Sequence, residues 1–286
     1  MQLITWNVQW FCGVDGRIDL PRVLRCAREM ADFDVLCLQE VAVNFPRLQG
    51  DASHDQPALL RELLPGFEVS FGAAVDVLAP DGRSRQRFGN LIASRLPVAQ
   101  VQHHPLPYAT KPDVRSMQRM ATCATLIAPW GPLRVMTSHF EYYSQAMRLA
   151  QAQELRRLHA QAWAAATRPS LPDDSGGPFQ SQPQATDVLI TADFNFEADS
   201  DEYRLMLADN GDAPRLHDCW RLVHGAAAHS PTFRVHDRTY GPVAIACDFI
   251  FASAGVAPRV QGIEVNTQTR ASDHQPVLLV LNDAPA

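Results

Sequence analysis

The chain has 286 residues, of which 46% are hydrophobic and 20% charged, a balance typical of a soluble globular protein with a sizeable core and not of a disordered or fibrous chain. Its formal net charge of −6 argues against a surface built for broad, sequence-independent nucleic-acid binding, because such binding depends on Lys and Arg neutralising phosphates. No apolar stretch approaches the length that spans a bilayer, and Met1 leads into a strand-like segment without a basic and apolar leader, so we expect a cytoplasmic protein.

Six cysteines lie scattered along the chain, several of them inside apolar segments, and no two form a CxxC pair. This distribution favours buried free thiols over disulfides or a zinc site. The six residues are Cys12, Cys26, Cys37, Cys123, Cys219 and Cys247.

Two predicted strands near the start of the chain each end in a polar residue. The apolar segment 3–6 ends at Asn7, and the near-continuous apolar run 34–38 leads to Glu40. Between them, Asp19 stands before a helix that has a proline in its first turn and apolar residues at helical spacing. The alternation of strand, helix and strand favours an α/β protein.

The middle of the chain is predicted to hold further strands and one long loop. Residues 102–118 contain two histidines, three prolines and charges of both signs, which indicates a loop. A strand that follows a Pro-Trp-Gly-Pro turn ends in His139. The remaining elements predicted in this part are a helix over 58–64 and strands over 67–75, 88–94, 120–127 and 133–137.

A long helix and a polar insertion are predicted next. Residues 144–166 are rich in good helix formers, whereas 168–186 are rich in Pro, Ser, Gly, Gln and Asp. We interpret 168–186 as a flexible insertion within a single domain over 1–286. The buried strand 187–191 then leads to Asp193. Later elements are a helix from a capping box at Asp199 and Glu202 to residue 207, and strands over 232–235, 245–251, 256–264 and 277–281.

Polar residues at strand ends have ordinary explanations when each is taken alone, as turn residues, caps or hydrogen-bonded core histidines. Asp248 is harder to explain in this way, because apolar residues flank it on both sides and a buried carboxylate without a partner is costly. Asp273 and His274, at the start of the last strand, combine a hard metal ligand with a group that titrates near neutral pH.

Taken together, six motifs resemble those of the endonuclease/exonuclease/phosphatase superfamily, which includes pancreatic-type deoxyribonuclease, abasic-site endonucleases, inositol-polyphosphate phosphatases, neutral sphingomyelinases and deadenylases. They are Trp6-Asn7-Val8, Leu38-Gln39-Glu40, Thr137-Ser138-His139-Phe140, Ala192-Asp193-Phe194-Asn195, Cys247-Asp248-Phe249-Ile250 and Ser272-Asp273-His274. The resemblance runs from the first strand to the last. It implies a four-layer α/β sandwich of two packed mixed β-sheets flanked by helices, with the site at one edge of the sheets.

The resemblance also implies a metal site. Glu40 would be the main ligand of a Mg²⁺ ion, for which Mn²⁺ may substitute, and Asn7 and Asp273 would lie close to the same ion or its water shell. The chemistry supports this assignment, because Mg²⁺ prefers oxygen donors and retains several waters.

Five further residues receive catalytic roles from the resemblance. Asp193 would orient or deprotonate the attacking water, and Asn195 would hold a phosphoryl oxygen. His274 would face the phosphate as an acid or charge stabiliser, with Asp248 fixing its tautomer and favouring the imidazolium. His139 resembles a second histidine that contacts the phosphate.

Three residues are candidates for substrate binding. Asn90 resembles a family position near the site, although an Asn beside a hairpin is an equally ordinary feature. Arg119 precedes a central strand and could reach a phosphate or remain a solvated charge. Tyr142 could line the pocket or pack under the following helix.

These features predict a metal-dependent phosphoric ester hydrolase in which water attacks the phosphate directly. Val41 follows Glu40 where abasic-site endonucleases have Thr, and Phe249 follows Asp248 where inositol phosphatases have Arg. With the acidic net charge, these departures favour a phosphodiesterase or phosphatase acting on a small or lipid-like phosphate. The alternatives are a nuclease that cleaves DNA or RNA, and a non-catalytic phosphate-binding module, which the six intact motifs disfavour. No obligate protein partner is implied.

Overall fold

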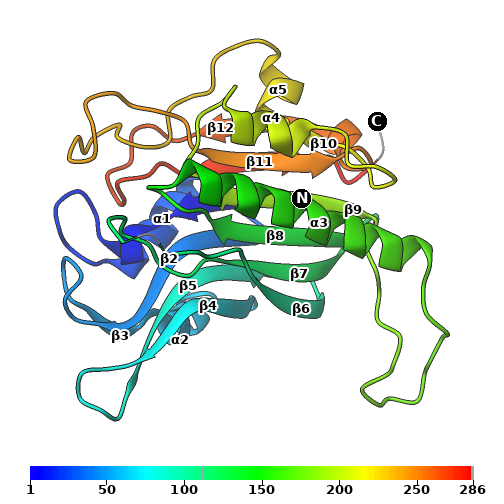
Figure 1. Cartoon of the computed structure of the whole chain (residues 1–286), viewed down its shortest axis with the longest axis horizontal. Coiled ribbons are helices and arrows are strands. Elements are labelled where there is room, and N and C mark those ends of the chain that lie inside the picture. The colour runs from blue at the N-terminus through cyan, green and yellow to red at the C-terminus, as the bar shows by residue number, and fades with distance from the viewer. Residues whose placement is uncertain (111, 285–286) are drawn as a thin grey trace.

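Two mixed β-sheets pack face to face, with helices on their outer faces (Figure 1). This computed structural model describes residues 1–110 and 112–284. The sheets contain seven and six strands, which confirms the predicted α/β sandwich. The apolar core between the sheets takes side chains from both, such as Leu3 and Val35 from the first and Val135 and Ile250 from the second.

The first sheet has the order β12-β13-β1-β2-β5-β4, with β3 paired to β2. Its strands are β1 (Gln2–Asn7), β2 (Val35–Phe45), β3 (Ala52–Asp55), β4 (Glu68–Leu78), β5 (Arg85–Ser94), β12 (Val260–Val265) and β13 (Val277–Leu281). The second sheet has the order β10-β11-β9-β8-β7-β6. Its strands are β6 (Val98–Pro105), β7 (Met120–Ala128), β8 (Gly131–His139), β9 (Asp187–Asp193), β10 (Leu216–Asp218) and β11 (Asp248–Ser253).

Helices cover the outer face of each sheet. Apolar residues of α1 and α2 pack on the first sheet, and those of α3 and α4 pack on the second. Side-chain caps fix where they begin: Asp19 accepts from the backbone N–H of Arg22 before α1, and Ser144 accepts from that of Met147 before α3. The helices are α1 (Leu20–Met30), α2 (Gln56–Leu63), α3 (Gln145–Thr167), α4 (Asp201–Leu207) and α5 (Cys219–His224), with 3₁₀ turns η1 (Gln9–Phe11) and η2 (Ala257–Arg259).

Parallel pairing brings the ends of β1, β8 and β9 to one edge of the sandwich, beside the middle of β2. β1 runs parallel to β2 with Asn7 opposite Gln39, and β8 runs parallel to β9 with His139 opposite Asp193. Buried polar contacts cross between the sheets beneath this edge, since Gln39 Nε2 donates to Thr137 Oγ1 at 2.8 Å. The segments that follow Asn7, Gln39, His139 and Asp193 therefore start close together, although β2 itself continues to Phe45, beyond the predicted strand end at residue 38.

Several predicted boundaries were wrong. Residues 102–105 belong to strand β6, because they pair with β7, and Pro105 is tolerated at the end of this edge strand. Residues 232–235 form no strand; Phe233 makes only isolated bridges. The N-cap of α4 is Ser200 in place of Asp199, and it accepts from the Tyr203 backbone N–H at 3.1 Å. Part of the predicted strand 256–264 is the 3₁₀ turn η2.

The segment 168–186 joins α3 to β9 with no helix or strand of its own and extends away from the sandwich at the lower right of Figure 1. Its flexibility and the single domain stay predictions. All six cysteines are free, and all but Cys26 are buried, as predicted. Among the described residues, no helix has both the length and the apolar character needed to cross a membrane.

Candidate active site

The polar ends of four strands border one cavity of about 430 Å³. Glu40 from β2, His139 from β8 and Asp193 from β9 line it, and Asn7 from β1 lies directly behind, bonded to two of them. The residues predicted for the site that line this cavity are Glu40, Arg119, His139, Tyr142, Asp193, Asn195, Asp273 and His274.

Asn7 links two carboxylates that come from different sheets. Its side-chain N–H groups donate to Glu40 Oε1 at 3.1 Å and to Asp193 Oδ2 at 2.9 Å. Its Oδ1 accepts from the backbone N–H of Gln9 at 3.0 Å. Asn7 therefore positions the two carboxylates, and the second lone pair of its Oδ1 stays open, so its place near a metal ion or its water shell stays a prediction.

A β-bulge sets the direction of Glu40. The register between β2 and β5 shifts between Leu38 and Val41, and Glu40 has a left-handed backbone with φ of 61°. A non-glycine residue persists in this strained conformation only where its surroundings hold it, and such residues cluster at functional sites. The bulge thereby separates Glu40 from the regular alternation of the strand.

The carboxylates of Glu40 and Asp273 fit a divalent cation. Burial and the neighbouring Asp273 raise the pKa of Glu40 to about 7, and burial raises the pKa of Asp273. Ionisation of both groups is unfavourable in this buried site, and the two negative charges would be balanced by one Mg²⁺. This ion prefers oxygen ligands and keeps several waters. The donor set therefore fits a magnesium ion, which Glu40 and Asp273 would hold.

Glu40→Gln is expected to make the metal-free protein more stable at pH 8. The folded-state pKa of Glu40 lies above its usual value of 4.5, so its contribution to stability is full below pH 4.5 and is lost as the pH rises toward 7. Removing this charge should recover about 2–3 kcal/mol of unfolding free energy at pH 8. Urea unfolding in chelator at pH 5 and pH 8 measures it.

Added Mg²⁺ should stabilise the wild type in the same assay and have a smaller effect on Glu40→Gln. The control is Glu68→Gln, which removes an exposed carboxylate at the start of β4. Equal behaviour of the two variants would contradict the assignment of Glu40.

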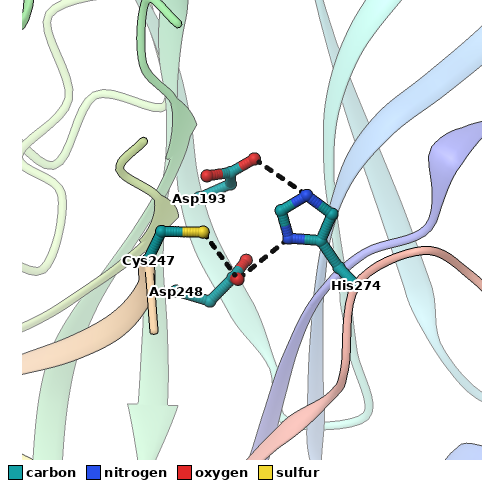
Figure 2. A group of neighbouring side chains, drawn as sticks. All are labelled: Asp193, Cys247, Asp248 and His274. Carbon is teal, nitrogen blue, oxygen red and sulfur yellow. Dashed lines mark hydrogen bonds and ion pairs between the residues drawn. The ribbon is translucent and has the colours of Figure 1, made fainter. Parts of the chain in front are cut away.

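His274 lies between two aspartates (Figure 2). Its Nδ1 is 2.9 Å from Asp248 Oδ2, and its Nε2 is 3.6 Å from Asp193 Oδ2. Burial opposes a charge on the ring, but Asp248 and Asp193 outweigh it and raise the pKa of His274 well above the usual range. The imidazolium is thus the stable form, with one nitrogen held by Asp248 and the other directed toward the cavity.

Cys247 completes a buried group with Asp193, Asp248 and His274 whose possible ligand atoms lie within 4.8 Å of one another. Hydrogen bonding explains this group better than a metal. Burial and Asp248 raise the pKa of the Cys247 thiol well above its usual value, so it is a neutral donor, and it lies 3.5 Å from Asp248 Oδ2. The raised pKa values of Cys247 and His274 favour the protonated form of both groups, whereas a metal ion binds a thiolate and a neutral imidazole.

Two residues that support this group were missed from the sequence. Thr232 Oγ1 accepts from the backbone N–H groups of Cys247 and Asp248, which fixes the start of β11. Phe233 stacks on His274, with ring centroids 4.3 Å apart and planes 19° apart. In the sequence, both residues lie in the segment 232–235, which we predicted as a strand. Such a pattern does not show whether an aromatic ring stacks on a site residue or packs in the core.

His139 faces two carboxylates but is neutral. Its Nδ1 is 3.7 Å from Glu40 Oε1, and its Nε2 is 3.4 Å from Asp193 Oδ2. Burial and the nearby Arg119 nevertheless lower the pKa of His139 to about 3. A neutral imidazole can still donate one N–H to a phosphoryl oxygen.

Arg119 is a buried cation on the cavity. Only 7% of it is exposed, its Nε is 4.0 Å from Glu141 Oε2, and its Nε and one terminal nitrogen have no hydrogen-bond partner among the described residues. A buried guanidinium with unpaired N–H groups is costly unless an anion fills the site. Arg119 is therefore available to a phosphate.

The other predicted contacts differ in their placement. Asn195 lines the cavity in a left-handed conformation, but its side-chain N–H donates to the carbonyl oxygen of Phe140 at 2.9 Å. Tyr142 lines the cavity beside Tyr240, with ring centroids 6.2 Å apart. Asn90 is not among the described residues that line it; its amide donates to the Met120 carbonyl oxygen, and it borders a small second cavity with Arg119 and His139, so its place in the site stays a prediction.

Three solved structures illustrate the likeness in fold. An endonuclease/exonuclease/phosphatase from Beutenbergia cavernae is 24% identical over 99% of this chain and 72% of that chain, with a TM-score of 0.68. A mannosyl-6-phosphatase from Bacteroides thetaiotaomicron is 16% identical over 98% and 99%, with a TM-score of 0.67. D. rerio TDP2, solved with a single strand DNA product, is 18% identical over 99% and 98%, with a TM-score of 0.62.

The comparison with curated proteins found no match. A model of the endonuclease/exonuclease/phosphatase family matches residues 4–274, a span that includes all six motifs and the site residues described above. The chain therefore belongs to the endonuclease/exonuclease/phosphatase family.

Proposed function

We propose that this protein is a magnesium-dependent hydrolase of small phosphoesters. The observation that carries the proposal is the position of Asp193, which shares one cavity with a protonated histidine, a buried arginine and a pair of metal-suited carboxylates. General base, general acid and anion binding are the three functions that hydrolysis of a phosphoester by water requires.

Asp193 is proposed to act on the attacking water. Asn7 holds its Oδ2, and the Asn195 backbone N–H donates to its Oδ1 at 3.0 Å, so the carboxylate is fixed from both sides. In the reaction the water oxygen forms a bond to phosphorus while the bond from phosphorus to the leaving oxygen breaks. One water proton passes to Asp193, and no covalent intermediate with the chain is formed.

His274 is proposed to supply the opposite charge. Its imidazolium can donate a proton to the leaving oxygen or stabilise the phosphoryl oxygens, while Asp248 keeps Nδ1 protonated and the ring in place. Arg119 and His139 offer further N–H donors to the phosphate. When held by Glu40 and Asp273, Mg²⁺ would supply positive charge that stabilises the phosphate during attack.

The size and charge of the cavity favour a small substrate. About 430 Å³ suits a small molecule, and Arg115 and Arg119 are the only Lys or Arg among the described residues that line it. Tracking a polynucleotide requires an extended basic groove. The phosphatase from B. thetaiotaomicron supports the first choice, whereas TDP2 with its DNA product keeps a nuclease as the second candidate.

A substrate panel tests the proposal. Aryl phosphate monoesters and diesters, sugar phosphates and phospholipids should be compared with supercoiled DNA, single-stranded DNA and RNA, each in Mg²⁺ and in chelator. We expect turnover of small esters that requires the metal. Faster, salt-sensitive cleavage of a polynucleotide would favour the nuclease, and loss of that cleavage in Asp193→Asn would assign it to this cavity.

Arg119→Met is expected to lower kcat/KM about 10²-fold, because it removes a charged donor from the phosphate while keeping the apolar volume of the side chain. Inhibition by inorganic phosphate should weaken in parallel. The control is Arg87→Met. Arg87 is a cation in strand β5 and does not line the cavity. An unchanged inhibition constant for phosphate in Arg119→Met would show that this residue does not contact the anion.

A further inference from the structure

Apolar and aromatic side chains form a distinct part of the cavity beside Glu40. We call the apolar wall the four residues Trp10, Leu48, Phe88 and Met117, which all line the cavity. A second aromatic group, around Tyr142 and Tyr240, lines another part. Among the described residues no aromatic contact joins the two groups, so the wall is a separate surface.

The backbone around Trp10 is strained. Gln9, Trp10 and Phe11 have φ values of 44°, 45° and 64°, all in the left-handed region, and none is a glycine. Such residues cost about 1–3 kcal/mol each and persist where surrounding contacts determine them. Three such residues in succession, beginning two positions after Asn7, indicate that surrounding contacts determine the conformation of this turn.

Two hydrogen bonds hold Trp10 in place, one to its backbone and one to its indole ring. Gln56, which is fully buried, donates from Nε2 to the Trp10 carbonyl oxygen at 2.8 Å and accepts from the backbone N–H of Ala42 in β2 at 2.8 Å. The indole N–H of Trp10 donates to the carbonyl oxygen of Gln49 at 2.8 Å. The ring is thus fixed against β2, and its only polar group is already paired.

The rest of the wall is built on the sheet that carries Glu40. Phe88 in β5 pairs with Ala42 in β2, two residues beyond Glu40. Its ring is 6.4 Å from that of Trp10 and 6.1 Å from that of Phe45, in an edge-on contact with the latter. Met117 reaches the cavity from the loop that leads to Arg119. The wall therefore adjoins both the metal-suited carboxylates and the anion-binding arginine.

We infer that the apolar wall binds a compact, uncharged apolar group of the substrate, so that the preferred phosphoesters are those of small aryl or aralkyl alcohols; this deepens, and rests on, the proposed function. The four side chains offer apolar surface and no free hydrogen-bond donor or acceptor, because the indole N–H is taken by Gln49. A sugar or glycerol group placed there would find no partners for its hydroxyls on the wall, and the cost of burying them weakens its binding.

Phosphonates give a test that does not depend on turnover, because their P–C bond is not hydrolysed. Binding of ethylphosphonate, 2-phenylethylphosphonate and 2,3-dihydroxypropylphosphonate to the Mg²⁺-loaded protein should be measured by calorimetry. We expect the phenylethyl compound to bind about tenfold or more tighter than the ethyl compound, the scale for burying one phenyl ring. The dihydroxypropyl compound should bind no tighter than the ethyl one.

Variants locate the preference. Trp10→Ala should bring the ratio of the two dissociation constants toward one, and Met117→Ala, in a loop, should lower it without affecting the sheet. Tyr143→Ala removes an exposed aromatic ring from the other side of the cavity and should leave the ratio unchanged. Equal binding of the ethyl and phenylethyl compounds, or a ratio lost only in Tyr143→Ala, would overturn the inference.

Failure of the proposed function has a different signature. If the phenylethyl preference is present and depends on Trp10 but no phosphoester is hydrolysed, the wall is a binding surface and the hydrolase proposal is wrong. If esters are hydrolysed without any preference, the hydrolase proposal stands and the wall does not contribute.

Discussion

Asp193→Asn is expected to lower kcat about 10²–10⁴-fold, the range for loss of a general base, with little change in KM. Asparagine has the same shape and its single oxygen can keep one of the two hydrogen bonds that Asp193 accepts, from Asn7 or from the Asn195 backbone N–H, so the fold and the cavity should be retained. What is lost is the negative charge that takes a proton from water. Steady-state kinetics on an aryl phosphodiester, with urea unfolding beside it, measures both effects.

A matched control lies on the same strand. Asp187→Asn makes the same substitution at the first residue of β9, at the opposite end from Asp193. It should leave kcat close to the wild-type value. If Asp193→Asn retained wild-type turnover while folding normally, Asp193 could not be the group that activates the water.

Asp248→Asn is expected to change the pH dependence of the reaction as well as its rate. In the wild type, Asp248 and Asp193 overcome the effect of burial and raise the pKa of His274, so the acidic form should persist to alkaline pH. Without the charge of Asp248, the pKa of His274 should fall, and the rate should decline at a lower pH than in the wild type. We expect kcat at pH 8 to drop about 10²–10³-fold and to recover partly at lower pH.

His274→Asn separates the positioning role of Asp248 from the catalytic role of the ring. It should lower kcat by a similar or larger factor at every pH, because no acid remains to titrate. The double variant should be little worse than His274→Asn, since residues that act as a unit are not additive. An additive double variant, or an Asp248→Asn profile parallel to that of the wild type, would show that Asp248 does not act through His274.

The strands and the order of their polar ends could be predicted from the sequence. The spacing of apolar residues, the composition of each segment and the turn residues between segments are all local signals. Residues 35–38 are apolar on both faces, and they form the buried start of β2 in the structure. The approach of Glu40 to Asp273, 233 positions later, is a result of sheet pairing, and only the family resemblance indicated it. The predicted roles of the site residues stay predictions until the variants above are measured.

Features that depend on backbone strain or on distant packing could not be predicted. The bulge at Glu40 and the left-handed turn at Trp10 cannot be detected in the hydrophobic pattern. Neither position is a glycine, the residue type that usually indicates a left-handed backbone. Strand β10 has three residues and helix α5 has six. Elements this short do not show enough of a periodic apolar pattern to be predicted from it. Asn90 was assigned from a motif position, whereas its hydrogen bond to Met120 is a tertiary contact.

We propose that water activated by Asp193 hydrolyses a phosphoester in this cavity with the help of a metal ion. The most direct measurement is the initial rate of aryl phosphodiester hydrolysis by chelator-stripped protein before and after addition of Mg²⁺, for the wild type and Asp193→Asn side by side. We predict no turnover before addition, full turnover after it in the wild type, and at most a hundredth of that rate in the variant. Hydrolysis that persists in chelator, or equal Mg²⁺-dependent rates in the two proteins, would contradict the account.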